Sequence, residues 1–343
     1  MPVISARGLA RTFRTRRGAG GKRNTVVEAV AGVDIDVAAG ELVGFLGPNG
    51  AGKTTTLRML TTLLRPTEGT ATVAGFDVVT ESEQVRRSIG YVSQSGGTSS
   101  YARAGEEVMD HGMLYGRTKA QVEKRGKELF DELQLDGLWN RLPKTMSGGQ
   151  KRRLDIAMGL IHDPTLIFLD EPTTGLDPQA RANLWEHIAD MRTRRGATVF
   201  LTTHYLDEAD TLSDRIIIID QGRIVASDTS DNLKAEVAGD LVDLEVADLD
   251  RVGEAAKRLG SLGDGSSDVE IDGRSVSGRV QRAGRAIPSL LRDLDASGVT
   301  LDSIEVHRPT LDDVFLTLTG RSLRDAEAAT ENPAETAPEG AHQ

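Results

Sequence analysis

The stretch that decides the fold is Gly47-Pro48-Asn49-Gly50-Ala51-Gly52-Lys53-Thr54-Thr55. An apolar run, Leu42 to Leu46, precedes it, and leucines at helical spacing follow it as far as Pro66. A strand, a glycine-rich loop and a helix in this order form the context that a phosphate-binding loop requires. The sequence therefore predicts that the chain binds a nucleoside triphosphate through this loop.

Each part of the loop has a predicted role at the phosphates. Its glycines let backbone N–H groups turn toward phosphate oxygens, and the N-terminus of the following helix adds partial positive charge. Lys53 can reach the terminal phosphates, and the hydroxyl of Thr54 can bind Mg2+. The loop thus predicts nucleotide ligands and a metal ligand within one short segment.

Composition narrows the class of protein. The 343 residues are enough for two domains, and the absence of cysteine excludes a disulfide framework and thiolate metal sites. The N-terminus lacks the apolar segment of a signal peptide, and no window approaches ~18 consecutive apolar residues. We therefore expect any role at a membrane to come through a partner.

The net charge of −11 is unevenly distributed along the chain. From Glu236 onward the chain has 22 acidic and 11 basic residues, whereas residues 1–235 have 30 of each. The acidic excess therefore lies in the C-terminal part, and it argues against nucleic acid as a partner.

Residues 1–40 alternate apolar and polar side chains. Alternation with a period of two predicts antiparallel strands beside the nucleotide-binding core. Phe13 lies at the end of the first of these patterns, where its ring could stack on an adenine or pack as an ordinary strand residue. The pattern leaves both interpretations of Phe13 open.

Polar residues follow apolar runs at three points where predicted strands end. They are Gln94, the pair Asp170 and Glu171, and His204. Ligands bind at the carboxyl ends of strands in open α/β sheets. The alternatives are an ordinary polar loop residue for Gln94, an acidic strand end that faces solvent for Asp170 and Glu171, and a structural histidine for His204. Gln94 could coordinate Mg2+ or hold the attacking water. Asp170 could hold Mg2+ through water, Glu171 could polarise the attacking water, and His204 could hydrogen-bond the γ-phosphate.

A second segment suited to anions is Ser147-Gly148-Gly149-Gln150, which precedes an apolar helical pattern. A serine and two glycines at a helix start leave backbone N–H groups for an anion. Because one loop is enough to cradle one nucleotide, a second anion-binding segment predicts a composite site, and an ordinary capped helix is the alternative. Residues from about 96 to 160 are predicted to form a helical subdomain.

Together these residues resemble the ATP-binding subunits of ABC transporters over roughly residues 3–235. The matching motifs are Walker A at Gly47 to Thr54, the Q-loop at Gln94, the signature at Met146 to Gln150, Walker B with its catalytic glutamate at Leu166 to Glu171, the D-loop at Gly175 to Asp177, the switch histidine at His204 and the adenine-stacking aromatic at Phe13. Met146 stands where leucine is usual. Residues 152–157, 203–210 and 311–320 further resemble the daunorubicin/doxorubicin-resistance type, which is associated with drug or lipid export.

The resemblance implies an α/β fold: a P-loop NTPase nucleotide-binding domain with an antiparallel β subdomain and a helical subdomain. It implies ATP and Mg2+ as ligands, and a head-to-tail homodimer with ATP between Walker A of one copy and the signature of the other. Glu171, His204 and Gln94 would be catalytic, and Thr54, Gln94 and Asp170 would be metal ligands. A separate transmembrane permease subunit would hold the chain at the cytoplasmic face of the membrane.

Two other functions fit parts of the sequence. One is a soluble ABC ATPase that acts on nucleic acid or ribosomes, but such proteins resemble this chain less, since they carry two nucleotide domains or a long coiled coil. The other is a nucleotide sensor that does not hydrolyse ATP, and the presence of Glu171 and His204 argues against it. The favoured interpretation is the ATPase subunit of an exporter.

The C-terminal part has no recognisable catalytic constellation. The order of patterns in residues 236–320, βαββαβ, predicts a small ferredoxin-like α+β domain. The resemblance implies a regulatory or dimer-stabilising module, and a packing appendage is the alternative. Residues 321–343 are rich in Ala, Glu, Pro and Thr and are predicted to be a disordered acidic tail. Residues 1–235 are predicted to form the ATP-binding domain.

Overall fold

The computed structural model describes residues 2–14, 26–99, 101–237, 239–262, 269–280 and 283–323. The described residues form two compact units that divide after Asp228. The boundary expected from the sequence, after residue 235, lies within helix α8 (Ser230–Val237). This helix packs against α11 (Leu311–Thr319) and so belongs to the second unit. Almost all of the predicted tail, residues 321–343, lies outside the described residues.

A six-stranded sheet forms the centre of the first unit, with strand order β10-β9-β3-β8-β7-β6. The strands from β9 to β6 are parallel, and β10 pairs antiparallel with β9 at one edge. Every residue of β3, β7 and β8 is buried, which explains their unbroken apolar runs. The strands are β3 (Leu42–Leu46), β6 (Ile89–Val92), β7 (Leu166–Asp170), β8 (Thr198–Thr203), β9 (Arg215–Asp220) and β10 (Arg223–Asp228).

The parallel arrangement positions the candidate site. Because β3, β6, β7 and β8 are parallel, their carboxyl ends lie along one edge of the sheet. The glycine-rich loop follows β3, Gln94 lies shortly after β6, Glu171 directly follows β7 and His204 directly follows β8. The topology thus brings residues that are distant in the sequence to the same edge.

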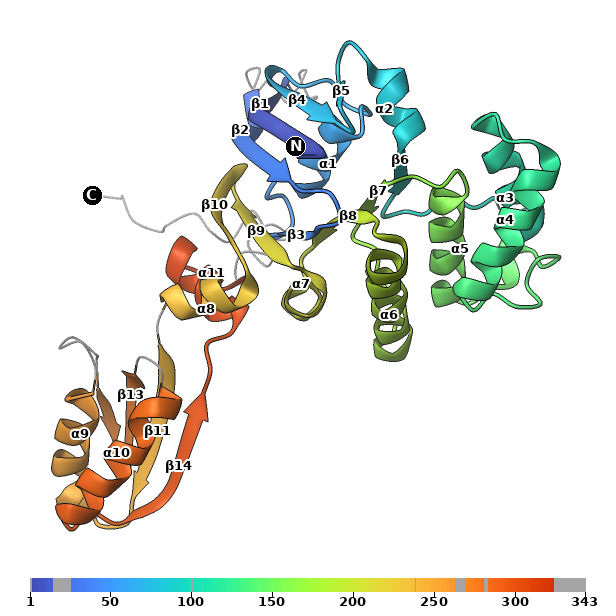
Figure 1. Ribbon diagram of the computed structural model, residues 1–343. Helices are drawn as coiled ribbons and strands as arrows, with labels where there is room; N and C mark the ends of the chain where they lie inside the picture. The colour runs from blue at the N-terminus through green and yellow to red at the C-terminus, as the bar shows by residue number, and fades with distance from the viewer. Residues whose placement is uncertain are drawn as a thin grey trace, which may run out of the picture. The chain divides into compact units, whose positions relative to one another are not determined.

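A second sheet in this unit has the order β2-β1-β4-β5 and is antiparallel throughout. It confirms the antiparallel strands predicted from the alternation in residues 1–40. Its buried side chains share one core with α1 and one face of the central sheet, beside which it lies in Figure 1. The elements are β1 (Ile4–Arg14), β2 (Val26–Val37), α1 (Lys53–Leu60), β4 (Glu68–Val73), β5 (Phe76–Asp77) and α2 (Ser82–Ser88).

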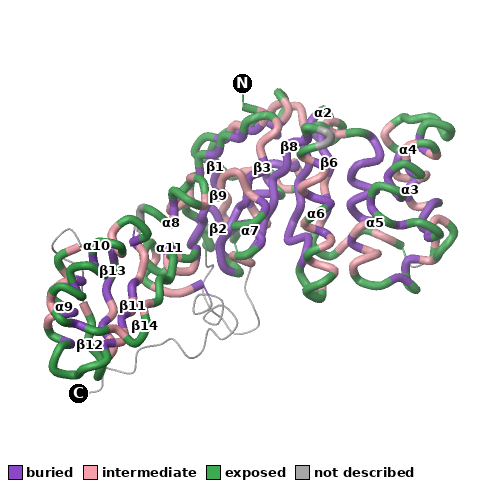
Figure 2. Tube along the Cα trace, turned by 60° about the horizontal axis from the view of Figure 1, so that its bottom comes forward, coloured by how far each residue is buried: buried purple, intermediate pink, exposed green. Residues whose placement is uncertain are grey.

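Helices cover the other face of the central sheet and include the predicted helical subdomain. Helices α3 and α4 pack against each other and against α5, and their apolar side chains share a second core with Ile167, Leu169 and Leu201 of the sheet. Figure 2 shows buried residues continuing along the central strands. The helices are α3 (Ala104–Leu114), α4 (Lys119–Glu132), the short η1 (Pro143–Thr145), α5 (Gly148–Leu160), α6 (Pro178–Arg195) and α7 (Leu206–Leu212).

The second unit contains a ferredoxin-like fold. Its sheet has the order β12-β13-β11-β14 with every neighbouring pair antiparallel, and side chains of α9 and α10 complete its core. The element order confirms the predicted βαββαβ pattern. The elements are β11 (Asp240–Val246), η2 (Leu249–Arg251), α9 (Val252–Gly260), β12 (Glu270–Asp272), β13 (Ser275–Val280), α10 (Ala283–Ala296) and β14 (Leu301–His307).

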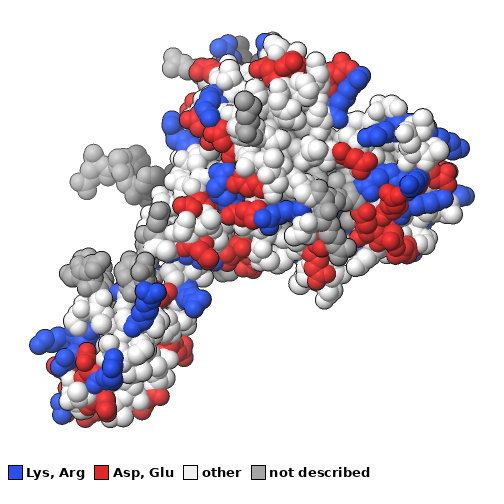
Figure 3. Space-filling model, in the orientation of Figure 1, with Lys and Arg blue, Asp and Glu red and all other residues white. Residues whose placement is uncertain are grey.

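Two surface properties bear on possible partners. Among the described residues, no helix combines the length and the apolar composition needed to cross a bilayer. On the face shown in Figure 3, Lys and Arg side chains are interspersed with Asp and Glu over both units. This face therefore has the mixed charge of an ordinary protein surface, and it does not favour nucleic-acid binding.

Candidate functional site

The loop between β3 and α1 has a backbone that requires glycine. Gly50 and Gly52 have φ angles of +79° and +107°, a region that residues with side chains rarely adopt. A Cβ on Gly47 would lie 2.2 Å from the carbonyl oxygen of Ile219. Gly52 is also the N-cap of α1, and it has no side chain to cap the N–H groups of the first turn. Those N–H groups can therefore bind an anion.

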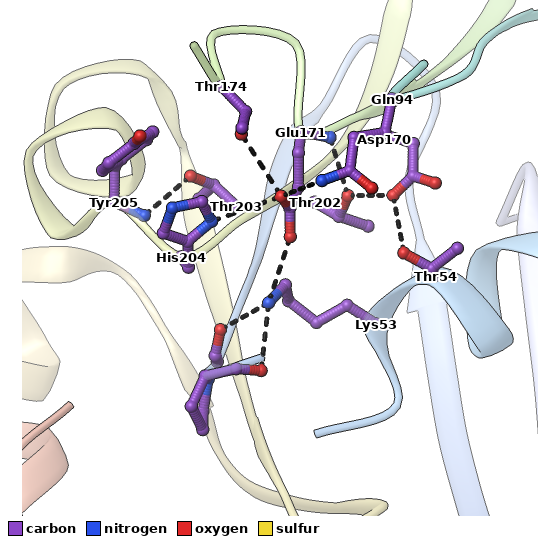
Figure 4. Close-up of polar contacts among 12 residues, drawn as sticks. Lys53, Thr54, Gln94, Asp170, Glu171, Thr174, Thr202, Thr203, His204 and Tyr205 are labelled. Atoms are coloured by element: carbon purple, nitrogen blue, oxygen red, sulfur yellow. Dashed lines mark hydrogen bonds and ion pairs between the residues drawn. The ribbon is translucent and has the colours of Figure 1, made fainter. Parts of the chain in front are cut away.

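Lys53 extends from the start of α1 toward the end of β7 (Figure 4). Its ammonium donates hydrogen bonds to the carbonyl oxygens of Gly47 (2.6 Å) and Pro48 (3.1 Å). It also lies 3.4 Å from Oε1 of Glu171, and both side chains of this ion pair are almost completely buried. Solvent screens such a pair weakly, so each charge strongly constrains the position of the other.

The side chains of Asp170 and Thr54 are joined by a hydrogen bond. Oδ1 of Asp170 accepts hydrogen bonds from the hydroxyls of Thr54 (3.1 Å) and Thr202 (2.7 Å). A carboxylate beside a hydroxyl offers the hard oxygen ligands that Mg2+ prefers, so these residues fit that ion.

Thr202 is a functional candidate that sequence patterns do not reveal. Its only cue in the sequence is a pair of threonines that follows the apolar run Val199 to Leu201, directly before His204.

Glu171 is held through both its backbone and its side chain. Its N–H donates to the carbonyl oxygen (3.1 Å) and the hydroxyl oxygen (3.0 Å) of Thr202. Its φ of +44° lies in the left-handed region, which is uncommon for a residue with a side chain. Its Oε2 accepts hydrogen bonds from Nε2 of Gln94 (2.8 Å) and the hydroxyl of Thr174 (3.2 Å). The position of this carboxylate is therefore closely defined.

His204 completes this cluster from the end of β8. Its Nδ1 lies 3.3 Å from Oε2 of Glu171, although the two groups are not aligned as a hydrogen bond. Burial alone would raise the pKa of Glu171, but the contact with His204 and the charge of Lys53 outweigh burial and lower the pKa to about 2. Glu171 is therefore ionised at neutral pH.

Two other groups of predicted nucleotide ligands lie outside the cluster drawn in Figure 4. Phe13, at the end of β1, is 37% exposed, and the guanidinium of Arg11 lies 4.8 Å from the centre of its ring. Ser147 is the N-cap of α5, where its hydroxyl accepts from the N–H of Gln150 (3.2 Å) and the Gln150 side chain accepts from the N–H of Ser147 (3.0 Å). This capping box accounts for Ser147 and Gln150 structurally, and Gly148 and Gly149 form the first turn.

Comparison with known proteins places the chain in a family. Residues 30–174 match the family model described as ABC transporter, and residues 229–319 match the one described as ATP-binding protein DrrA1-3-like, C-terminal domain. The chain is 41% identical to the Daunorubicin resistance ATP-binding protein DrrA3 of Streptomyces coeruleorubidus, over 90% of this chain and 96% of that relative. The chain belongs to the ABC transporter ATP-binding family.

A further relative and a solved structure agree with this placement. The ABC protein is 36% identical to the Linearmycin resistance ATP-binding protein LnrL of Bacillus subtilis, over 86% of this chain and 95% of that relative. The solved "Dimeric structure of a post-hydrolysis state of the ATP-binding cassette MJ0796 bound to ADP and Pi" matches with a TM-score of 0.59 and 26% identity, covering 66% of this chain and 98% of that one. This ABC protein therefore binds nucleotide and hydrolyses ATP.

Proposed function

We propose that this ABC ATPase drives the export of a drug-like or lipid-like compound through a separate transmembrane permease, at the cytoplasmic face of the membrane. The names of its relatives support export as the direction of transport. DrrA3 and LnrL are named as resistance proteins for daunorubicin and linearmycin, and a third relative, 35% identical, is the Nod factor export ATP-binding protein I of Cupriavidus pinatubonensis. Each is named as an ATP-binding protein, which leaves the passage of the compound to another subunit.

A soluble ABC ATPase that acts on nucleic acid or ribosomes is not favoured. All three of these relatives are named for resistance or export. The second unit also matches the DrrA-like C-terminal model along almost its whole described length. Both findings support the exporter instead.

The single observation that carries the chemistry is the ionised, buried carboxylate of Glu171 beside the glycine-rich loop. Glu171 lies between Lys53 and His204, where it can polarise a water that attacks the γ-phosphate. The ring of His204 can donate a hydrogen bond to the same phosphate, and Gln94 can hold the water in place. Glu171, His204 and Gln94 are therefore the proposed catalytic groups.

The proposed nucleotide and metal ligands are the neighbours of these groups. Residues 47–55 form the phosphate cradle, with the N–H groups at the start of α1 and the ammonium of Lys53 as donors. Thr54, Asp170 and Gln94 are the residues that would hold Mg2+, which when bound neutralises charge on the phosphates. The threonine and aspartate already share a hydrogen bond, so little reorganisation is needed to present both oxygens to one ion.

A head-to-tail homodimer would complete the site. In this arrangement residues 147–150 of a second copy bind the nucleotide held by residues 47–55, and the exposed ring of Phe13 stacks on its adenine. The open first turn at Gly148 and Gly149 supports the first contact, and the dimeric cassette that matches the fold supports the assembly. Each ATP then contacts both copies, so ATP binding favours the closed dimer and hydrolysis releases it.

Replacing Glu171 with glutamine tests this proposal. Glu171→Gln keeps the size of the side chain but removes its charge, so turnover should fall by at least about 100-fold while ATP still binds and the dimer still closes. Phosphate release, nucleotide titration and sizing with ATP measure the three properties. Glu83→Gln, which alters an exposed ion pair with Arg87, is the matched control. Wild-type turnover in Glu171→Gln would overturn the assignment of Glu171.

The same two variants test the export function. Cells that express the full chain with its membrane partner should expel a drug-like compound such as daunorubicin. Glu171→Gln should abolish that efflux, and Glu83→Gln should retain it. Loss of cellular daunorubicin fluorescence measures the efflux. Equal efflux in cells with and without the chain would refute drug-like compounds as the transported class.

A further inference from the structure

Helix α5 carries a buried charged pair, Arg152 and Asp155, which lie one helical turn apart. Both residues are only 7% exposed. A buried charge is costly unless hydrogen bonds and opposite charges compensate it, so the contacts of this pair show what it holds in place. Those contacts lead to the backbone beside two proposed catalytic residues, Glu171 and Gln94.

Arg152 anchors the carbonyl groups of the two residues that flank Glu171. Its Nε donates to the carbonyl oxygen of Pro172 (2.7 Å), and its Nη2 donates to the carbonyl oxygen of Asp170 (3.0 Å). Between these two anchored carbonyls, Glu171 has its left-handed backbone with φ +44°. The guanidinium therefore stabilises the unusual backbone that directs the Glu171 carboxylate.

The same guanidinium holds the turn that carries Gln94. Its Nη1 donates to the carbonyl oxygen of Ser93 (2.5 Å), the atom that also accepts the turn-closing N–H of Gly96 (3.2 Å). At the other end of the turn, Oδ1 of Asp155 accepts from the N–H of Gly97 (2.9 Å). One turn of α5 therefore holds the chain on both sides of Gln94.

Gly96 shows how closely Asp155 approaches this turn. Its φ is +74°, and a Cβ there would lie 2.8 Å from Oδ2 of Asp155. Burial raises the pKa of Asp155, and the hydrogen bond from Gly97 and the charge of Arg152 oppose that rise. The turn therefore has no room for a side chain at residue 96, and its hydrogen bonds to α5 resist movement away from the helix.

We propose that Arg152 and Asp155 are positioning residues for ATP hydrolysis. Together they set the backbone at Glu171 and at Gln94, and so they set the 2.8 Å contact between those two side chains. This inference rests on the catalytic roles proposed above for Glu171 and Gln94. Because α5 begins directly after Ser147, the helix that would contact a partner's nucleotide is joined by these hydrogen bonds to the backbone beside the catalytic groups of its own copy.

Lysine should not replace Arg152 in this role. Three different nitrogens of the guanidinium bond to three separate carbonyl oxygens, whereas an ammonium is a compact point charge. Arg152→Lys therefore keeps the charge but loses the bridge between strand ends. Arg152→Met keeps much of the side-chain volume but loses both the charge and the bridge.

Steady-state ATP hydrolysis by the full chain tests the proposal. In Arg152→Met and Arg152→Lys, kcat should fall at least about tenfold because the catalytic groups are misplaced, while KM for ATP should change less than about twofold. The three hydrogen bonds of Arg152 go to none of the phosphate-cradle residues, which is why binding should be spared. Arg153→Met is the matched control, since Nη1 of Arg153 donates a long hydrogen bond of 3.4 Å to the exposed Gln134 side chain. Unchanged kcat in Arg152→Met would overturn the proposal.

A double-mutant cycle with Glu171→Gln separates positioning from general damage to the structure. If Arg152 acts through Glu171 and Gln94, Arg152→Met should lower kcat much less in the Glu171→Gln background than in the wild-type protein. Fully additive losses would refute the positioning role. Where Arg152→Met does not fold, as judged by thermal unfolding, the cycle is run with Arg152→Lys. Wild-type turnover in Glu171→Gln alone would instead refute the catalytic role proposed above for Glu171, so the two failures are distinguishable.

Discussion

The hydroxyl of Thr202 shows how much of the site depends on a single buried oxygen. It donates a hydrogen bond to Asp170 and accepts one from the backbone N–H of Glu171. The residue has no exposed surface. Because water cannot easily take the place of a buried partner, loss of this hydroxyl would leave both neighbours short of a hydrogen bond.

We expect Thr202→Val, which conserves the shape of the side chain, to lower turnover by about tenfold, the rate equivalent of ~1.4 kcal/mol. The Mg2+ concentration for half-maximal rate should rise, because Asp170 is then free to turn away from Thr54. A Mg2+ titration of the steady-state rate measures both effects. Thr202→Ser retains the hydroxyl and is the control. Equal impairment in the serine variant would show that the hydroxyl is not responsible.

At the scale of elements, the segment after α5 is fixed by an aromatic contact. His162 stacks on Tyr115, with ring centres 3.8 Å apart and planes 5° apart. Its Nε2 forms a hydrogen bond with the carbonyl oxygen of Ile89 (2.9 Å). These contacts join the ends of α3 and α5 to the start of β6. They therefore connect the helical subdomain to the strand that precedes Gln94.

This junction should make stability depend on pH. Burial lowers the pKa of His162 to about 4; the charges of His111 and Arg117 also lower it, and the hydrogen bond with Ile89 and the charge of Asp163 oppose the shift. The unfolded chain, with a His pKa of about 6.5, binds more protons than the folded protein below that pH. Stability is therefore fully present above pH ~6.5 and is lost progressively as the pH falls toward 4.

The expected loss between pH 7.5 and pH 5 is about 2 kcal/mol from this residue. Urea unfolding at the two pH values measures it. His162→Gln, which cannot titrate and can still donate to the carbonyl oxygen, should show a pH dependence smaller by about that amount. An identical dependence in the two proteins would rule out His162 as the source.

The elements of the core could be predicted because buried parallel strands require unbroken apolar runs, and the polar residue after each run must lie at the edge of the sheet. Gln94, Glu171 and His204 lie together for this reason. Thr202 could not be recognised, because its role depends on the register that places it opposite Asp170. Arg152 is one of three consecutive basic residues in the sequence, and only tertiary packing shows which one is buried.

At the scale of the whole molecule, the order of strands and helices was enough to predict the ferredoxin-like fold of the second unit. The place where the units divide was not evident, since it depends on α8 packing against α11, two segments far apart in the sequence. Local patterns cannot show such a pairing. Local patterns also did not show that Leu323 is buried, or that its N–H donates to Oδ1 of Asp312 (3.1 Å).

Two truncations test whether the predicted tail, residues 321–343, is dispensable and what Leu323 contributes. Removal of residues 324–343 should leave both thermal unfolding and ATPase rate unchanged. Removal of residues 321–343 also deletes the buried Leu323 side chain, and it should destabilise the second unit by about 2 kcal/mol while ATPase activity persists. Calorimetry and phosphate release measure the two properties. Identical unfolding of the two truncated chains would show that Leu323 contributes nothing.

At Glu171, an unfavourable backbone and a favourable charge interaction oppose each other. A left-handed backbone costs a residue with a side chain roughly 1 kcal/mol relative to glycine. Glycine would also remove the carboxylate from the buried ion pair with Lys53, and loss of one partner of such a pair typically costs about 3–5 kcal/mol. A laboratory evolution scheme that rewards heat resistance alone should therefore retain an acidic side chain at this position, so selection for a stable fold also protects hydrolysis.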